Sequence, residues 1–169
     1  MNRIFQTSLG PEVDDLTASE KKKPPLWECP ACTQRFVTRN MSHSCGQHTI
    51  DEHFEGKDRE VREIFDLLVR AVRRIGRVHV YAQKTRIVFQ TRGRFVAVTP
   101  RKHYLGGHLW LKRRRGHAVV HRIESLLDRD YVHNFRLTCS EDLDESFRDL
   151  LREAYVVGSQ EFDPNAAGG

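Results

Sequence analysis

The chain has 169 residues, of which 38% are hydrophobic, and it carries a formal net charge of +5. This length suits one ordinary domain together with a small module. No stretch approaches the roughly 20 apolar residues that a membrane span requires, and the first residues lack the apolar core of a signal peptide. The composition therefore argues against a membrane protein and predicts a cytoplasmic one, in which cysteines stay reduced.

Four segments are expected along the chain. Residues 1–26 are polar, contain a run of three lysines and two prolines, and predict a disordered tail and linker. Residues 27–57 form a predicted zinc-binding module, and residues 58–158 form a predicted α+β domain. Residues 159–169 predict a second, short disordered tail.

Three of the four cysteines lie in one short window with the spacing of a metal site. Cys29 and Cys32 form one pair, Cys45 and His48 form a second, and twelve residues separate the two pairs. Two ligand pairs joined by such a loop suit tetrahedral Zn²⁺, and a site closed by four protein ligands is structural. His43 is an alternative ligand, and the spacing leaves open whether His43 or Cys45 is the third one.

The module differs from a Cys2His2 finger. Only two residues separate Cys45 from His48, whereas such fingers usually have about three to five residues at this point. A base-reading finger also needs several exposed side chains on its helix, and the segment after Phe36 offers a poor set. The spacing favours a treble-clef-like or knuckle module, which would brace the aromatic residues Trp27, Phe36 and Phe54.

A helix is predicted at each end of the α+β domain. Apolar residues from Val61 to Ile75 recur at the spacing of one helix face, and Gly76 is the predicted C-cap. Ser140 is the predicted N-cap of the second helix, which ends at Gly158. Because each helix has one apolar face, each is expected to cover a sheet.

Between the helices the apolar pattern changes to a period of two, which is typical of strands. The connections are too short for parallel crossovers, so antiparallel neighbours are expected, with turns at residues 91–93 and 106–107. The predicted fold is an α+β domain with a meander of about six antiparallel strands flanked by an N-terminal and a C-terminal helix. The predicted strands are residues 78–81, 86–90, 94–98, 108–112, 119–123 and 132–138.

The charges are sorted along the chain. Residues 76–122 contain twelve Lys and Arg and no Asp or Glu, whereas residues 124–169 contain four Arg and eleven Asp and Glu. This asymmetry predicts a polyanionic partner for the basic part. The alternative is an internal match, in which the acidic C-terminal helix lies over the basic sheet.

Strand alternation predicts that Ile87, Phe89 and Ala97 face the helices, while the opposite face carries arginines and Trp110. Arginine and indole side chains on an open sheet suit phosphate contact and base stacking, although a merely solvated face has the same composition. Residues 112–115 predict a solvated hairpin tip that attracts polyanions. The candidate nucleic-acid contacts are Arg86, Arg94, Arg101, Lys102, Trp110, Lys112, Arg113, Arg114 and Arg115.

Catalytic patterns are weak in this sequence. It contains no His-Glu-x-x-His, no Gly-x-Ser-x-Gly and no phosphate-cradling P-loop. Cys139 is expected to be a small buried residue near a strand end. No catalytic residue is therefore predicted.

Several segments carry a resemblance to a known family: residues 84–90, 94–98, 132–137 and 150–155, preceded by 27–30, 43–46 and 51–54. In these segments the chain resembles bacterial proteins that carry domain of unknown function 5655, a family without an established function. Relatives of the domain occur fused to nuclease-like or restriction-like domains. The resemblance therefore implies a nucleic-acid role by association only, and it assigns no catalytic residue.

Three hypotheses follow from these features. The leading one is a zinc-stabilised, non-enzymatic protein that binds DNA or RNA, or is associated with nucleic acid, through its basic sheet. The second is a protein-interaction or regulatory module that acts through a protein partner or self-association without nucleic acid. The third is an enzyme with an unrecognised site.

Overall fold

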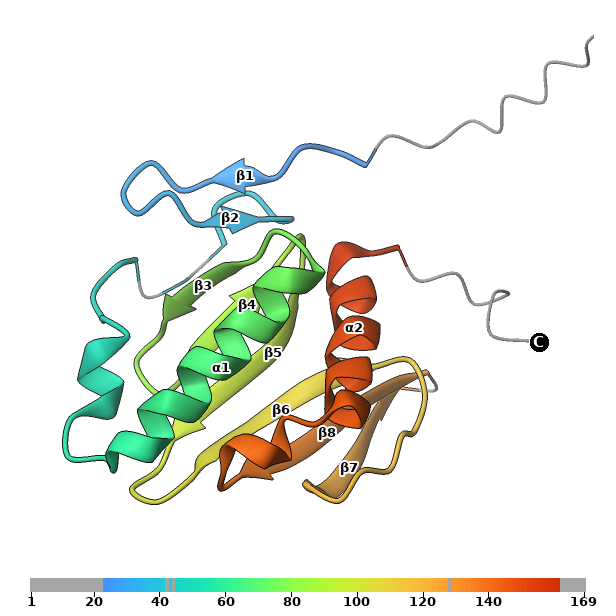
Figure 1. Cartoon of the computed structure of the whole chain (residues 1–169). Coiled ribbons are helices and arrows are strands. Elements are labelled where there is room, and N and C mark those ends of the chain that lie inside the picture. The colour runs from blue at the N-terminus through green and yellow to red at the C-terminus, as the bar shows by residue number, and fades with distance from the viewer. Residues whose placement is uncertain (1–22, 42, 44, 128, 162–169) are drawn as a thin grey trace, which may run out of the picture.

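The computed structural model of the chain describes residues 23–41, 43, 45–127 and 129–161. Most of the two predicted disordered tails, residues 1–22 and 162–169, lies outside the described residues. The described part begins with a two-stranded sheet and continues with a six-stranded sheet and two long helices (Figure 1). The predicted α+β class, with antiparallel strands and a helix before and after them, is confirmed.

The small sheet and the 3-10 helix η1 precede the main domain, in which α1 comes before the strands and α2 after them. In chain order the elements are β1 (Trp27–Glu28), β2 (Arg35–Phe36), η1 (Asp51–Phe54), α1 (Arg59–Ile75), β3 (His79–Ala82), β4 (Ile87–Gln90), β5 (Arg94–Pro100), β6 (Leu105–Leu111), β7 (Val120–Leu127), β8 (Asp130–Leu137), the 3-10 helix η2 (Ser140–Asp142) and α2 (Glu145–Ser159).

The main sheet is not a simple meander. Its strand order is β3-β4-β5-β6-β8-β7, and every neighbouring pair is antiparallel. β3 to β6 follow the predicted meander, but β8 lies beside β6 and β7 forms the outer edge. The prediction was wrong here because a β7–β8 hairpin fits either order, and the strand sequences do not say which of the two joins β6. Residues 112–119 are therefore a connection that passes β8, and they are not the predicted hairpin tip.

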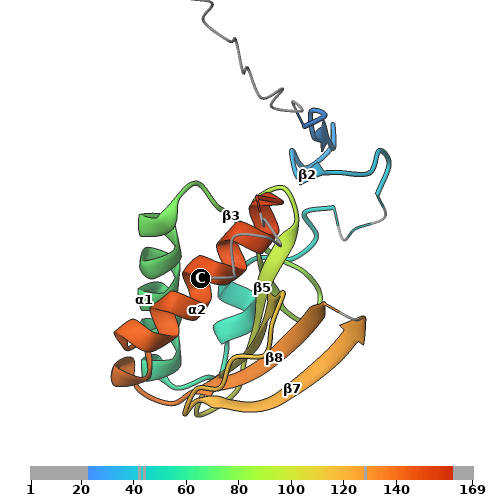
Figure 2. The ribbon, with the colours of Figure 1, turned by 90° about the vertical axis from the view of Figure 1, so that its right-hand side faces the viewer.

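Both helices pack on one face of the main sheet, as Figure 2 shows from the side. The buried residues of α1 are Val61, Ile64, Phe65, Leu68 and Val72, which confirms the predicted apolar face. They form one core with apolar residues of the sheet and of α2. Full burial of each large apolar side chain contributes roughly 1.5–3 kcal/mol to stability, so this single core holds the domain together.

α2 begins later than predicted. Its N-cap is Asp144, whose carboxylate accepts a hydrogen bond from the backbone N–H of Phe147 at 2.7 Å. The predicted N-cap, Ser140, opens η2 instead, where the carboxylate of Asp142 accepts a hydrogen bond from the backbone N–H of Cys139 at 3.1 Å. Ser and Asp are both preferred N-cap residues, so the segment offers several candidates and the sequence does not rank them.

Gly106 and Gly107 lie inside β6 and do not form the predicted turn. A Cβ atom at Gly107 would come within 2.5 Å of the Phe135 ring and 2.8 Å of the Ala97 carbonyl oxygen. The missing side chain makes room for Phe135, which packs against Phe147 of α2 with ring centroids 5.1 Å apart. Gly107 is thus a packing requirement of the core, although a Gly-Gly pair is typical of turns.

The connection between β6 and β7 is anchored by a buried histidine. His133 of β8 is fully buried, and its Nε2 accepts a hydrogen bond from the backbone N–H of Arg115 at 2.9 Å. Its Nδ1 faces the carbonyl oxygen of Tyr131 at 3.4 Å. Burial lowers the pKa of His133; the Tyr131 carbonyl and Glu153 oppose this shift, and nearby guanidinium groups add to it. A neutral His133 is the form that can accept the hydrogen bond from Arg115.

Acidification is expected to destabilise the fold through His133. Because its pKa in the folded state lies below its ordinary value of about 6.5, the unfolded state binds more protons between these two pH values. The free energy of unfolding should therefore fall as the pH decreases through about 6.5, and level off below the folded-state pKa. Urea titrations of the wild type and of His133→Leu, between about pH 7.5 and pH 5.5, test this.

The variant should show a smaller dependence of the free energy of unfolding on pH. Some dependence should remain, because burial also lowers the pKa values of His79 and His108. If the free energy of unfolding of His133→Leu depended on pH as strongly as that of the wild type, the proposed role of His133 would be contradicted.

Candidate metal centre and the helix-free sheet face

The β1–β2 hairpin brings the first two cysteines together. Cys29 follows β1, its backbone N–H donates to the carbonyl of Gln34 at 2.8 Å, and its carbonyl accepts from the N–H of Thr33 at 2.8 Å. The chain thereby reverses over the four residues between β1 and Thr33, which has a left-handed φ of 59°. This tight reversal brings the Cys32 thiol toward the Cys29 thiol.

The second pair comes from the segment that follows β2. Cys45 and Gly46 both have a positive φ, of 41° and 73°, so the chain turns sharply at this cysteine. The turn places Cys45 and His43 next to the first pair. One donor atom from each of Cys29, Cys32, His43 and Cys45 lies within 4.8 Å of the others, and this group could hold a metal ion.

The donor set fits tetrahedral zinc. The Sγ atoms of Cys29 and Cys45 are 3.8 Å apart, and two thiolates at about 2.3 Å from one tetrahedral Zn²⁺ would be about 3.8 Å apart. The Sγ of Cys32 and the Nε2 of His43 are 3.1 Å apart, somewhat closer than the roughly 3.5 Å of a zinc-bound pair. A small rotation of the imidazole supplies that difference.

The second ring nitrogen of His43 supports its role as a ligand. Nδ1 lies 2.6 Å from the carbonyl oxygen of Met41, which can only accept a hydrogen bond, so Nδ1 carries the proton. Nε2 then presents a lone pair toward Cys32. Metal-binding histidines characteristically donate their other N–H to a carbonyl or carboxylate in this way.

His48, the ligand first expected from spacing, lies elsewhere. Its Nδ1 is 3.7 Å from a carboxylate oxygen of Glu52, and it is not part of the group that contains Cys29. The alternative ligand His43 takes the fourth place beside the three thiols. Spacing favoured His48 because it completes a short Cys-x-x-His pair, but the sharp turn at Cys45 brings the preceding histidine to the site.

The thiols of Cys29 and Cys45 do not ionise independently. A hydrogen bond with the backbone of Ala31 lowers the pKa of Cys29 to about 7, and a hydrogen bond with Cys29 raises the pKa of Cys45 to about 11. The Cys29 thiolate therefore forms readily, and Cys45 then resists ionisation because like charges at this distance repel. A divalent cation removes this repulsion, so the cluster is set up to bind a cation.

The module is joined to the main domain by polar and aromatic contacts. The side-chain amide of Gln90 donates a hydrogen bond to the carbonyl of Arg35 in β2. Trp27 packs on Phe36 with ring centroids 6.0 Å apart, as expected for the module. Phe54 belongs to the main core instead, and its ring centroid lies 5.1 Å from that of Phe65.

The sheet face opposite to α1 and α2, here called the helix-free face, is defined by the strand register. Val88 pairs with Ala97, Ala97 with His108, and His108 with Asn134, so these side chains share that face. Ala97 therefore faces away from the helices, contrary to prediction. A bulge between β4 and β5 shifts the alternation, so that Phe95 and Val96 both reach the helix-side core. The face includes His79, Tyr81, Arg86, Val88, Gln90, Arg94, Ala97, Thr99, His108, Trp110, Arg122, Glu124, Val132, Asn134 and Arg136.

The helix-free face is only partly open. Tyr81, Val88 and Ala97, from the neighbouring strands β3, β4 and β5, form a small buried cluster on it. Around it, the guanidinium of Arg94 donates to the Tyr81 hydroxyl at 3.1 Å, and the rings of His108 and Trp110 meet edge to face. The face thus combines apolar and aromatic side chains with the guanidinium groups of Arg86 and Arg94 and with the ion pair between Arg122 and Glu124 at 3.1 Å.

The predicted nucleic-acid contacts fall into three places. Arg86, Arg94 and Trp110 lie on the helix-free face. Arg101 and Lys102 lie in the β5–β6 turn, at one end of the sheet. The run from Lys112 to Arg115 lies in the β6–β7 connection, where Lys112 pairs with Asp130 at 2.5 Å and Arg113 and Arg115 pair with Glu153 at 2.9 Å and 3.4 Å. The guanidinium of Arg114 lies over the ring of Tyr131, 5.3 Å from its centroid.

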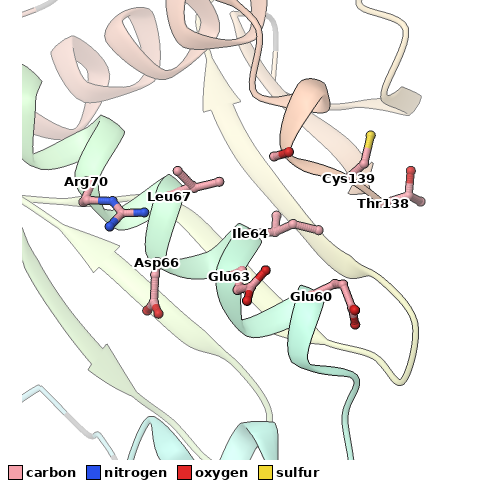
Figure 3. A pocket seen from close by; sticks show the side chains of 9 residues that line it. Glu60, Glu63, Ile64, Asp66, Leu67, Arg70, Thr138 and Cys139 are labelled. Carbon is pink, nitrogen blue, oxygen red and sulfur yellow. The ribbon is translucent and has the colours of Figure 1, made fainter.

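A cavity of about 540 Å³ lies between α1 and the η2 segment (Figure 3). Its wall includes Glu60, Glu63 and Asp66 of α1, together with the thiol of Cys139. Cys139 is exposed, so the expectation that it is buried was wrong; it follows β8, where the chain leaves the core to form η2. With three carboxylates in its wall, the cavity is unsuited to a nucleic-acid phosphate.

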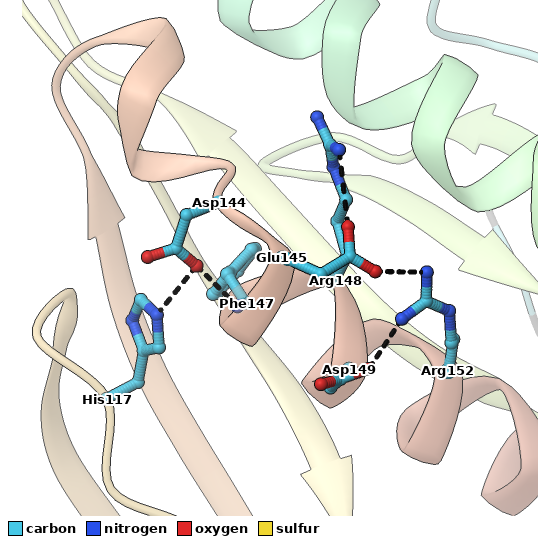
Figure 4. Close-up of polar contacts among 7 residues, drawn as sticks. All are labelled: His117, Asp144, Glu145, Phe147, Arg148, Asp149 and Arg152. Atoms are coloured by element: carbon cyan, nitrogen blue, oxygen red, sulfur yellow. Dashed lines mark hydrogen bonds and ion pairs between the residues drawn. The ribbon is translucent and has the colours of Figure 1, made fainter.

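The acidic residues of α2 pair mainly within their own helix. Figure 4 shows Glu145 and Asp149 joined to Arg148 and Arg152, with Glu145 and Arg152 2.6 Å apart. Only Glu153 of α2 pairs with cations of the acid-free stretch, those in the β6–β7 connection. Among the described residues, the match between α2 and the basic stretch is therefore confined to that connection. On the helix-free face Arg122 pairs with Glu124 of its own strand at 3.1 Å, whereas neither Arg86 nor Arg94 has an ion pair among the described residues.

The fold and the cluster define an α+β protein in which a small Cys- and His-containing module precedes an antiparallel sheet with two helices on one face. The family model described as "Domain of unknown function (DUF5655)" matches residues 50–158, and the chain belongs to this family. The four clustered residues precede the matched region. No curated protein and no solved structure matches the chain. Among the described residues, no helix is both long and apolar enough to cross a membrane.

Proposed function

We propose that this chain is a zinc-stabilised binding protein that holds single-stranded nucleic acid on its helix-free face. Zinc is proposed as the metal because three thiols and one imidazole are the donors of structural zinc sites, while oxygen-seeking Mg²⁺ and Ca²⁺ disfavour them. In this role the ion shapes the module that adjoins the sheet, and no chemical step is assigned to it.

The nucleic-acid proposal rests on one observation: the acidic helix α2 does not cover the cations of the helix-free face. The acidic helix packs on the other side of the sheet, and Arg86 and Arg94 have no carboxylate within ion-pair distance among the described residues. Both side chains are exposed. Unpaired guanidinium groups on the same sheet face as a half-buried Trp110 suit phosphate contact combined with base stacking, which is how single strands are held without sequence preference.

Fluorescence anisotropy with labelled single-stranded and duplex oligonucleotides tests this function. At low salt the chain should bind the single strand more tightly than the duplex, and binding should weaken steeply as salt is added. A double variant, Arg86→Gln with Arg94→Gln, should bind with a weaker salt dependence. The slope of log affinity against log salt concentration should become shallower by roughly 0.7 for each phosphate contact that is lost. The matched control is Arg129→Gln, an exposed arginine in the β7–β8 turn at the far edge of the sheet.

The control should bind like the wild type. The proposal fails if no oligonucleotide binds at low salt, or if the control and the double variant weaken binding equally.

A further inference from the structure

A second cavity, of about 330 Å³, lies where the metal-binding module meets the main sheet. Its wall comes from the linker before β1, from β2, from the residues between α1 and β3, from the first residue of β3, from the last residue of β4 and from the β4–β5 turn. The residues that line it are Leu26, Arg35, Arg77, Val78, His79, Gln90, Thr91 and Arg92. Three of these eight residues are arginines and none is acidic.

Two of the three guanidinium groups have no carboxylate partner among the described residues. Arg92 donates hydrogen bonds to the side-chain oxygen of Gln160 at 3.2 Å and to the carbonyl of Pro24 at 2.6 Å, and both acceptors are neutral. The side chain of Arg77 has no ion pair among the described residues. Arg35 is paired with Glu28 at 3.1 Å, but both of these side chains are largely exposed, so the pair is weak.

Positive charges gathered in a concave site without counter-charge repel one another and concentrate anions. The contacts of Arg92 hold its guanidinium in place at the cavity, so part of its rotational freedom is already lost. Guanidinium groups bind phosphate oxygens through paired hydrogen bonds, which makes a phosphate group the best-matched anion.

The rest of the wall is apolar. Leu26 and Val78 contribute hydrocarbon surface, and His79 stacks on Tyr81 with ring centroids 5.1 Å apart. The volume lies at the small end of the roughly 300–1,000 Å³ that is typical of ligand sites. The cavity therefore suits a compact ligand with one charged end and one flat or apolar part.

We propose that this cavity binds a phosphomonoester that carries a compact aromatic group, such as a nucleotide. Arg77 and Arg92 hold the phosphate, and the wall formed by Leu26, Val78 and His79 contacts the base. The ligand is either a free mononucleotide or the 5′-phosphorylated end of a strand, since both present the same chemistry. The proposal goes beyond strand binding on the helix-free face and stands without it.

Isothermal titration calorimetry of the full chain with AMP, and with adenosine as the phosphate-free probe, tests the cavity. A second arm compares oligonucleotides of one sequence that end in a 5′-phosphate or a 5′-hydroxyl. Binding of AMP but not adenosine assigns the site to free nucleotides, and a preference for the 5′-phosphate without AMP binding assigns it to strand ends. In either case Arg77→Gln should weaken the phosphate-dependent binding by about tenfold or more.

Arg92→Gln should do the same, and the control Arg129→Gln should leave it unchanged. Arg77 lies on the surface and supports no core packing, so its replacement leaves the fold intact. The inference is overturned if neither AMP nor the 5′-phosphate is distinguished from its phosphate-free partner, or if Arg77→Gln and Arg92→Gln both bind as tightly as the control. Strand binding that ignores the 5′-phosphate would refute this site and leave the proposed function standing.

Discussion

Replacing Cys45 with alanine is expected to release the metal ion and unfold residues 27–50, while the domain from α1 to α2 stays folded. The module has few buried side chains. Among the described residues between 23 and 49, only Cys29, Gln34 and Phe36 are buried. Structural zinc contributes roughly 10–16 kcal/mol in small modules of this kind, far more than three buried side chains supply. Removing one of four ligands therefore removes most of what holds the module together.

Limited proteolysis combined with metal analysis measures this effect. The variant should be cleaved within residues 27–50 and should lose its metal, while the fragment that contains α1 and α2 resists cleavage. The matched control is Cys139→Ala, because Cys139 is exposed and lies outside the cluster. Full metal retention and unchanged protection in Cys45→Ala would show that these thiols do not hold the ion.

The second large effect is expected at the centre of the main core. Phe147 of α2 is fully buried and meets both Phe135 and His117, with ring centroids 5.1 Å and 5.6 Å apart. Phe147→Ala removes a ring from a site closed by the sheet on one side and the helix on the other. The free energy of unfolding should fall by about 3–5 kcal/mol, because the cavity cannot fully collapse.

Urea unfolding followed by circular dichroism measures this loss. The control is Val156→Ala on the same helix, whose side chain is exposed and whose replacement should cost about 0.5 kcal/mol or less. A loss at Phe147 as small as that of the control would contradict the position of α2 over the sheet.

The sequence predicts the elements of this fold better than their order. The apolar period of α1 and the alternation in β4, β6 and β8 depend on local side-chain direction, which a sequence records directly. In β5 the bulge beside β4 breaks the alternation, which is why the prediction for Ala97 was wrong. The exchange of β7 and β8 depends on long-range pairing, and nothing local distinguishes the two orders. Gly107 makes room for Phe135, which lies nearly thirty residues later in the chain. The local Gly-Gly pair is typical of a turn, so it predicts the wrong structure here.

The candidate metal site was predictable in kind, since the three clustered cysteines stand out in the sequence. Its fourth member depends on backbone angles at Cys45 and on the hydrogen bond from His43 to Met41, and spacing reports neither. The cavity lined by Arg77 and Arg92 could not be foreseen, because its wall joins segments that are far apart in the chain. The one available signal was the absence of acidic residues between 76 and 122.

The most direct test of this account is the metal content of the purified chain and of two histidine variants, measured by inductively coupled plasma mass spectrometry. We expect one zinc ion per chain in the wild type and in His48→Ala, and a weakened site that loses zinc to a mild chelator in His43→Ala. A wild-type chain that purifies without bound metal and takes up none from added zinc, or a site that depends on His48 and not on His43, would contradict it.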